Sequence, residues 1–249
     1  MNSYHATERF SDRADQYRLY RPEYPEAIIS FLNDRLQPAG NFQIADIGSG
    51  TGIFSKLLLQ AGYAVNGIEP NAAMRAQANT SLSQYPAFTS VDGTAEATTL
   101  ADDSVDLITV AQAFHWFRPQ ETRKEFERIL KPGGRILLVW NILQTNTPFL
   151  AAYTQIKEHF SEKIAHPHRA NLQSIQEIFA PKQVITHQLE QKQTLSAEGL
   201  KGHLLSFSTV PLASDPAYEN MIQQVQHLFE QYNVDGRVTL EYHTKLYLI

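Results

Sequence analysis

The chain has 249 residues, of which 43% are hydrophobic and 19% charged, and this balance is typical of folded globular proteins. The formal net charge is −5 at pH 7 and no long block of lysine and arginine occurs, so we expect no nucleic-acid partner. The sequence has no cysteine, which excludes disulfides, thiolate nucleophiles and cysteine-ligated zinc. Its N-terminus is polar and its most apolar run, Ile136–Trp140, is far shorter than a membrane span. We therefore expect a cytoplasmic protein with no membrane partner.

The first part of the chain alternates between strand and helix patterns. An apolar run at Gln43–Gly48 ends in a glycine-rich turn, after which apolar residues recur at helical spacing until Gly62. Further strands are predicted at Ala64–Glu69, Phe88–Val91, Val105–Val110 and Arg135–Trp140, with helices at Asn71–Leu82 and Gln120–Leu130 and a turn at Lys131–Gly134. This alternation predicts an open, mostly parallel sheet with helices on both faces, whose ligands bind beyond the carboxyl ends of the strands.

The pattern changes after Asn141. Helices are predicted near Phe149–Phe160, Leu172–Phe179 and Ala197–Phe207, a strand near Gln183–Thr194, an amphipathic helix around Met221–Tyr232 and a terminal strand at Val238–Leu248. We predict a single domain over residues 1–249. Its expected parts are an N-terminal helical cap at 1–41, a cofactor-binding core at 42–141, a helical lid or substrate region at 142–235, and a terminal sheet strand at 236–249.

Three glycines follow the first strand at alternate positions: Gly48, Gly50 and Gly52. Missing side chains there let the chain turn sharply and let a ligand approach the backbone. A dinucleotide fingerprint would place its third glycine where Ile53 stands, so a pyrophosphate cofactor is disfavoured. Glu69 closes the second strand 19 positions after Gly50, where a carboxylate can accept both hydroxyls of an adenosine ribose. Each feature alone is more often a tight turn or a solvated glutamate, but together they indicate a nucleoside ligand.

Five segments in chain order form a larger pattern: ADIGSGTG from Ala45, GIEP at 67–70, DGTAE at 92–96, SVDLITVAQAFHWF at 104–117 and LKPGGRILLVW at 130–140. Over residues 10–141 this series resembles the class I S-adenosylmethionine-dependent methyltransferases. The AQAFHWF segment and the leading FSDRADQYRLYRPEYP are similar to one branch, the small-molecule enzymes like trans-aconitate methyltransferase. The resemblance implies an α/β fold with a Rossmann-like, mostly parallel seven-stranded sheet, helices on both faces and an antiparallel C-terminal strand.

The resemblance also implies a function and a set of residues. The expected reaction moves a methyl group from S-adenosylmethionine to a small molecule, with a carboxylic acid as one candidate acceptor. Glycines 48 and 50 would pass the methionine part of the cofactor, Glu69 would hold its ribose and Met74 would flank its adenine. Many relatives have Asp where Thr94 stands, so the adenine edge would be bordered mainly by backbone there. The implied cofactor-binding residues are Tyr17, Gly48, Gly50, Glu69, Pro70, Met74, Thr94, Ala95, Glu96, Ala111 and Gln112.

The acceptor side is predicted from residues beside these motifs. His115 is the candidate catalytic base, because an imidazole with a pKa near 6.5 can take a proton from an oxygen or nitrogen acceptor, whereas a carboxylate acceptor needs no base. Its alternative is an orienting or packing role. Trp116 could line the substrate pocket or pack in the core. Arg18 and Arg21 could clamp an acidic substrate or the cofactor carboxylate, or form surface ion pairs with Asp15 or Glu23.

Other readings stay open. The pair His166 and His168 has metal-like spacing but no completing ligand nearby, so we expect no metal. Nothing distinguishes His203, His227 and His243 from structural histidines. A non-catalytic nucleoside-binding module is one alternative function, and an NAD-dependent oxidoreductase is a weaker one. The patterns do not predict an oligomeric state.

Overall fold

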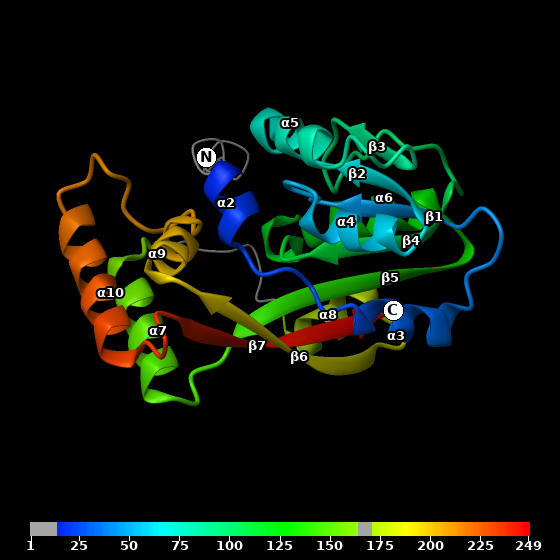
Figure 1. Cartoon of the computed structure of the whole chain (residues 1–249). Coiled ribbons are helices and arrows are strands. Elements are labelled where there is room, and N and C mark those ends of the chain that lie inside the picture. Colours follow the sequence, from blue (N-terminus) through cyan, green and yellow to red (C-terminus); the bar gives the residue numbers. More distant parts are fainter. Residues whose placement is uncertain (1–13, 164–170) are drawn as a thin grey trace.

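The computed structural model describes residues 14–163 and 171–249. Its centre is a seven-stranded sheet with the strand order β3-β2-β1-β4-β5-β7-β6 (Figure 1). The strands are β1 (Gln43–Ile47), β2 (Ala64–Ile68), β3 (Phe88–Val91), β4 (Val105–Ala111), β5 (Leu130–Leu143), β6 (Ile185–Leu195) and β7 (Val238–Leu248). Strands β1 to β5 are parallel, and β7 runs antiparallel to both of its neighbours. The predicted sheet is therefore confirmed, including its antiparallel C-terminal strand.

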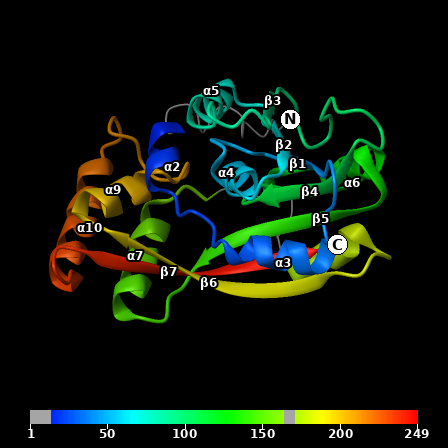
Figure 2. The same cartoon turned by 45° about the vertical axis from the view of Figure 1, so that its right-hand side comes forward.

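Helices cover both faces of the sheet because its central strands are apolar on both sides. On one face, α3 (Ala27–Leu36) and α4 (Ile53–Gln60) pack against the strands, and α3 lies over β7 and β6 (Figures 1 and 2). On the other face, α6 (Pro119–Ile129) and α8 (Leu172–Phe179) bury Phe126 and Phe179. Each such buried side chain stabilises the fold by about 1.5–3 kcal/mol. The packed helices on both faces thus fix the positions of the strand ends that carry the candidate site.

A second helical group lies beyond the carboxyl ends of the parallel strands. It consists of α7 (Pro148–Phe160), α9 (Ala197–Leu205) and α10 (Tyr218–Tyr232), which pack with the adjoining ends of β6 and β7 (Figure 1). Strand β7 joins the two parts, since its Tyr242 lies in this helical cluster and its Leu246 lies in the core of the sheet.

The short helix α2 (Ala14–Tyr20) bridges the two parts, with α9 on one side and α5 (Ala72–Ser81) on the other (Figure 1). A Cβ atom on Gly202 of α9 would lie 2.4 Å from the ring of Tyr20, so the two helices meet through bare glycine backbone. The side chain of Gln193 also donates to the Tyr20 carbonyl at 2.9 Å. The expected cap at 1–41 is therefore divided, because α2 packs beside α9 whereas α3 packs on the sheet.

Two further segments differ from the sequence prediction. The region 142–235, predicted as a helical lid or substrate region, also contains β6 of the sheet and α8 on the sheet face. The turn expected at Lys131–Gly134 lies inside β5 as a bulge. Its position follows from the pairing, in which Val105 is opposite Leu130 but Leu107 is already opposite Arg135.

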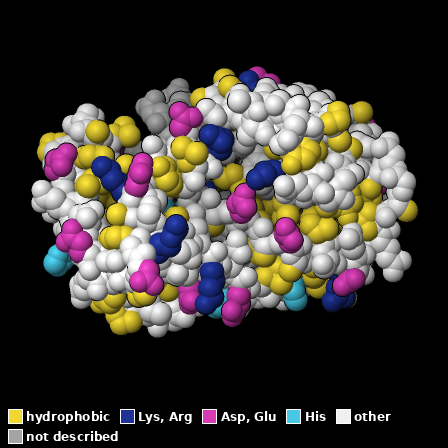
Figure 3. Space-filling model, viewed as in Figure 1, with side chains coloured by type: hydrophobic (Ala, Val, Ile, Leu, Met, Phe, Trp, Pro, Cys, Tyr) yellow, Lys and Arg dark blue, Asp and Glu magenta, His cyan; other side chains and the backbone are white. Residues whose placement is uncertain are grey.

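The surface gives no sign of a strongly charged face in the view of Figure 3, where acidic and basic side chains are interspersed. Within residues 14–163 and 171–249, no helix is long and apolar enough to cross a membrane. In the same residues no group of three or more His, Asp or Glu side chains could hold a metal ion. His166 and His168 lie outside the described residues.

Candidate functional site

Two adjoining cavities open at the carboxyl ends of β1, β2 and β4. The first has a volume of about 170 Å³ and extends from the glycine turn toward the second helical group, and the second has a volume of about 110 Å³ and extends toward Glu69. Both are lined by Tyr17, Gly48, Gly50, Ala111 and Gln112. The structure thus brings five predicted cofactor-binding residues together where the cavities meet.

The glycine turn after β1 shapes this junction. Gly48 has a φ of +67°, and a Cβ atom there would lie 2.6 Å from Cβ of Ala113. Gly50 has a φ of +57°, and its Cβ position would face open space with no atom within 4 Å. Both positions therefore favour glycine, the first for a close approach and the second for its left-handed backbone. The bare backbone at Gly50 is open to a ligand.

Glu69 connects the end of β2 to this turn. Its Oε2 accepts a hydrogen bond from the Gly50 amide at 3.0 Å, and its Oε1 accepts one from the Asn71 amide at 2.9 Å. Burial raises the pKa of the Glu69 carboxyl, and the two amides oppose that rise. Each carboxylate oxygen still has acceptor capacity, so the group can receive two further hydrogen bonds on the cavity side.

Asp46 is a site residue that the sequence analysis did not identify. It is only 1% exposed, lines the first cavity, and accepts hydrogen bonds from the Ser55 hydroxyl at 2.6 Å and the Thr109 hydroxyl at 2.8 Å. Burial raises the pKa of Asp46 to about 6. The signal available in the sequence was an acid two positions before Gly48. A buried carboxylate here would attract the cationic part of a ligand.

Gln112 directly follows β4 and has an unusual backbone conformation. Its φ is +58°, a conformation that a non-glycine residue adopts only when its surroundings enforce it. The enforcing contacts are hydrogen bonds from its amide to the Val139 carbonyl and from its side chain to the Asn141 carbonyl, both at 2.9 Å. Gln112 is therefore held firmly where the two cavities meet.

The second cavity is the more apolar slot. Besides the shared residues it is lined by Glu69, Pro70, Met74, Ala113, Trp116 and Phe117. Trp116, predicted as a substrate residue, therefore lies with the predicted cofactor-binding residues. Arg21, the other predicted substrate residue, lines the first cavity.

Four predicted residues line neither cavity. Thr94, Ala95 and Glu96 follow β3, where Thr94 forms a backbone bridge with Ala97 and Glu96 accepts a hydrogen bond from the Arg118 amide. His115 is half-buried on the short 3-10 helix η2 (Phe114–Trp116), with its ring centroid 5.2 Å from that of Trp116. Its predicted position at the reactive end stays a prediction.

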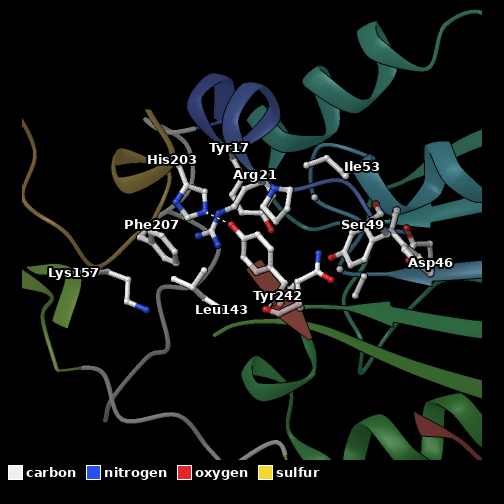
Figure 4. A pocket seen from close by; sticks show the side chains of 18 residues that line it. Tyr17, Arg21, Asp46, Ser49, Ile53, Leu143, Lys157, His203, Phe207 and Tyr242 are labelled. Atoms are coloured by element: carbon white, nitrogen blue, oxygen red, sulfur yellow. Dashed lines mark hydrogen bonds between the residues drawn. The ribbon is translucent and has the colours of Figure 1, made fainter. Parts of the chain in front are cut away.

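The far end of the first cavity is built from both parts of the molecule (Figure 4). Arg21, just after α2, places its guanidinium 3.9 Å from the ring centroid of Phe207 and donates to the Ser206 carbonyl at 3.3 Å. Lys157 from α7 lies 5.0 Å from the same ring centroid. Arg18 is exposed and does not line the cavity, and Glu23 pairs with Lys56 at 3.0 Å.

His203 was not distinguished from structural histidines in the sequence, yet it lines this end and is only 1% exposed. Its Nδ1 lies 2.7 Å from the Tyr153 hydroxyl and its Nε2 lies 3.1 Å from the Tyr242 hydroxyl. Burial lowers its pKa well below the usual value, and the charges of Arg21 and Lys157 lower it further. The histidine is therefore neutral at pH 7, with one ring nitrogen donating and the other accepting.

The neighbouring hydrogen bonds determine which nitrogen donates. Gln193 gives its Nε2 hydrogen to the Tyr20 carbonyl, so its Oε1 faces Tyr242 and accepts the Tyr242 hydroxyl hydrogen at 3.1 Å. The Tyr242 oxygen must then accept from Nε2–H of His203, and Nδ1 accepts from Tyr153. The hydrogen of Tyr242 is thus directed away from His203.

Comparison with known proteins gives a consistent result. Residues 45–138 match the family model for the methyltransferase domain. An uncharacterized methyltransferase from Schizosaccharomyces pombe is 32% identical over 149 residues, covering 59% of this chain and 58% of that protein. An uncharacterized methyltransferase from Mycobacterium bovis is 39% identical over 132 residues, covering 53% of this chain and 51% of that protein. The matched part spans little more than half the length of these relatives.

Solved structures share the fold over a greater length. A structure from Anaeromyxobacter dehalogenans, named as a type II methyltransferase, has a TM-score of 0.67 at 20% identity and covers 92% of this chain and 97% of its own. Phosphoethanolamine N-methyltransferase 2 from Haemonchus contortus, solved with S-adenosyl-L-methionine, has a TM-score of 0.56 at 16% identity and covers 96% of this chain and 56% of its own.

Proposed function

We propose that this chain, which carries a class I S-adenosylmethionine-dependent methyltransferase domain, transfers a methyl group from S-adenosylmethionine to a small carboxylic acid. The predicted family is confirmed by the domain match and the methyltransferase relatives. The branch similar to trans-aconitate methyltransferase, the absence of a nucleic-acid partner and the cytoplasmic location stay predictions. The observation that carries the proposal is the junction of two cavities, one with Glu69 and the other with Arg21.

The residues of the junction fit this cofactor. Glu69 has acceptor capacity left for two ribose hydroxyls, and the apolar slot beside Met74 suits an adenine ring. Asp46 offers a buried carboxylate to a cationic ligand, and Gly50 leaves its backbone open. When bound, S-adenosylmethionine supplies a methyl group on a positively charged sulfur.

The chain itself has to orient the acceptor and exclude water. Gln112 and the glycine turn hold fixed positions where the cavities meet, and orientation of this kind can supply several kcal/mol of the barrier reduction. Arg21 can bind a carboxylate of the acceptor, and Tyr17 borders both cavities. A carboxylate oxygen has no proton to lose at neutral pH, so such an acceptor reacts without a base.

The test is turnover of purified protein with S-adenosylmethionine and a panel of small carboxylic acids, phenols and amines, with S-adenosylhomocysteine as the readout. We expect product with at least one acid, and a higher KM for that acid in Arg21→Gln. Methylation of phenols or amines but of no acid would contradict the acceptor class. Cofactor binding without product from any acceptor would favour the non-catalytic module, and stronger thermal stabilisation by NAD would favour the oxidoreductase.

A further inference from the structure

Two positively charged side chains, those of Arg21 and Lys157, lie toward one end of the first cavity. Figure 4 shows Lys157, His203 and Phe207 at one end and Ser49 and Asp46 at the other. The guanidinium of Arg21 and the ammonium of Lys157 lie 3.9 Å and 5.0 Å from the ring centroid of Phe207. Asp46, at the opposite end, is the only acid among the described residues that line this cavity.

In residues 14–163 and 171–249, neither Arg21 nor Lys157 forms an ion pair with an acidic side chain. The Nε atom of Arg21 is buried and has no hydrogen-bond partner there. Burial lowers the pKa of Lys157, the negative charge of Glu158 opposes that shift, and the positive charge of Arg21 adds to it. Unpaired charge is costly where side chains are partly buried, as both of these are, so the arrangement favours a bound anion.

The tyrosine and histidine groups around the cations do not supply that anion. His203 is neutral, and burial raises the pKa of the Tyr242 hydroxyl well above its usual value. The hydroxyl hydrogen of Tyr242 is already given to Gln193. The charged hydrogen-bond donors that the described residues offer a ligand at this end are therefore those of Arg21 and Lys157.

We infer that Lys157 and Arg21 together bind one carboxylate of the acceptor, separate from the group that receives the methyl, and that Lys157 determines specificity for it. This inference rests on the proposed function. One arginine N–H group is already used by the Ser206 carbonyl, and the remaining N–H groups of the planar guanidinium suit the two coplanar oxygens of a carboxylate. The reacting group then lies toward Gln112 and the glycine turn.

Binding without turnover tests the inference directly. Calorimetric titration with succinate and glutarate in the presence of S-adenosylhomocysteine should give weaker binding in Lys157→Gln by about tenfold or more, and near-normal binding in Lys157→Arg. Lys201→Gln, at an exposed lysine of α9, is the matched control and should bind as the wild type does. The neutral diamides of the same acids should bind weakly to all variants. Equal diacid affinity in the wild type and Lys157→Gln, or no diacid binding at all, overturns the inference.

Two further readouts separate this inference from the proposed function and from another anion. Diacid binding that depends on Lys157, without S-adenosylhomocysteine formation from any acceptor, would uphold the inference and contradict the reaction. Product formation with an unchanged KM in Lys157→Gln would uphold the reaction and contradict the inference. Inorganic phosphate that binds more tightly than the diacids, in a Lys157-dependent manner, would overturn the assignment of the anion as a carboxylate.

Discussion

The carboxylate of Glu69 holds the glycine turn in place and also faces the second cavity. Loss of hydrogen bonds to a charged group costs about 1.5–3 kcal/mol each. Glu69→Ala should therefore raise the Kd of S-adenosylhomocysteine by about tenfold or more, as measured by calorimetric titration. Glu121→Ala, at an exposed glutamate of α6, is the control and should leave the Kd unchanged. The ribose assignment fails if both variants bind as the wild type does.

Asp46 should make the affinity for the cofactor depend on pH, and its raised pKa determines the direction of that dependence. Burial raises the pKa of Asp46 to about 6, and a cationic ligand beside it favours the ionised form. Below about pH 6 the free protein must release this proton before it binds. The affinity for S-adenosylmethionine should therefore fall as the pH decreases from about 6 to 5, by up to about tenfold per pH unit.

Calorimetric titration between pH 5 and 8 measures this dependence. The matched variant is Asp46→Asn, whose amide keeps the shape but does not titrate, so its affinity should be weaker and nearly flat over the same range. A wild-type affinity that stays constant below pH 6 would exclude Asp46 as a partner of the cofactor's positive charge.

His115 provides a test of whether the reaction uses a base. The residue lines neither cavity, and a carboxylate acceptor needs no proton removed. For an acid acceptor, we therefore expect His115→Gln to keep kcat within about threefold of the wild-type value, which is below the usual effect of losing a general base. Steady-state kinetics over pH 6 to 9 provide the measurement. A kcat loss of a hundredfold at unchanged KM would instead support the predicted catalytic base.

Among the elements, α2 depends on the absence of a side chain on α9. Replacing glycine by alanine inside a helix normally stabilises it by about 1 kcal/mol. At Gly202, however, the added Cβ would lie 2.4 Å from the Tyr20 ring, and crowding of this kind costs about 1–3 kcal/mol. Gly202→Ala should therefore lower the stability and displace α2, with weaker binding at both cavities because Tyr17 and Arg21 move with it.

Chemical denaturation and cofactor titration measure these two effects. The double variant Gly202→Ala, Tyr20→Ala removes the overlapping ring, so it should bind the cofactor better than the single variant does. Stabilisation in Gly202→Ala with unchanged binding would show that α2 does not depend on this contact.

The sequence predicts some elements of the site much better than others. Gly48, Gly50 and Glu69 come from one strand–turn–helix unit and the next strand, so their proximity follows from local pattern and parallel pairing. Lys157, His203 and Tyr242 come from α7, α9 and β7 and meet only through tertiary packing. Periodicity predicts that these elements exist and does not predict which of their faces meet. The bulge in β5 was also missed, because Gly133 and Gly134 are as typical of a turn as of a bulge.

At the scale of the whole molecule, His203 joins parts of the chain that are far apart in sequence. It bonds to Tyr153 of α7 and to Tyr242 of β7, and Tyr242 continues through Gln193 of β6 to the backbone of α2. These hydrogen bonds run behind the end of the first cavity that Arg21 and Lys157 line. These hydrogen bonds require a neutral imidazole. Protonation of His203 would therefore break them and weaken the contact between the second helical group and the sheet.

The stability of the fold should therefore fall at mildly acidic pH. Burial lowers the pKa of His203 in the folded state, whereas the unfolded chain has a histidine pKa near 6.5. Below about pH 6.5 the unfolded state takes up a proton that the native state excludes, so this contribution is complete above pH 6.5 and is lost as the pH falls, by up to about 1.4 kcal/mol per pH unit. Asp46, with its raised pKa, acts in the opposite direction between about pH 6 and 4.

Comparison with His203→Gln isolates the contribution of His203 to the pH dependence of the free energy of unfolding, because Asp46 contributes equally in both proteins. The free energy of unfolding, measured by urea denaturation from pH 7.5 to 5.5, should decrease more steeply with falling pH in the wild type than in the variant. The variant loses hydrogen bonds and is expected to be less stable at pH 7.5, so the difference between the two proteins should narrow toward pH 5.5. Parallel pH profiles would mean that His203 titrates alike in the folded and unfolded states, and that the hydrogen-bond chain from α7 to α2 does not depend on a neutral imidazole.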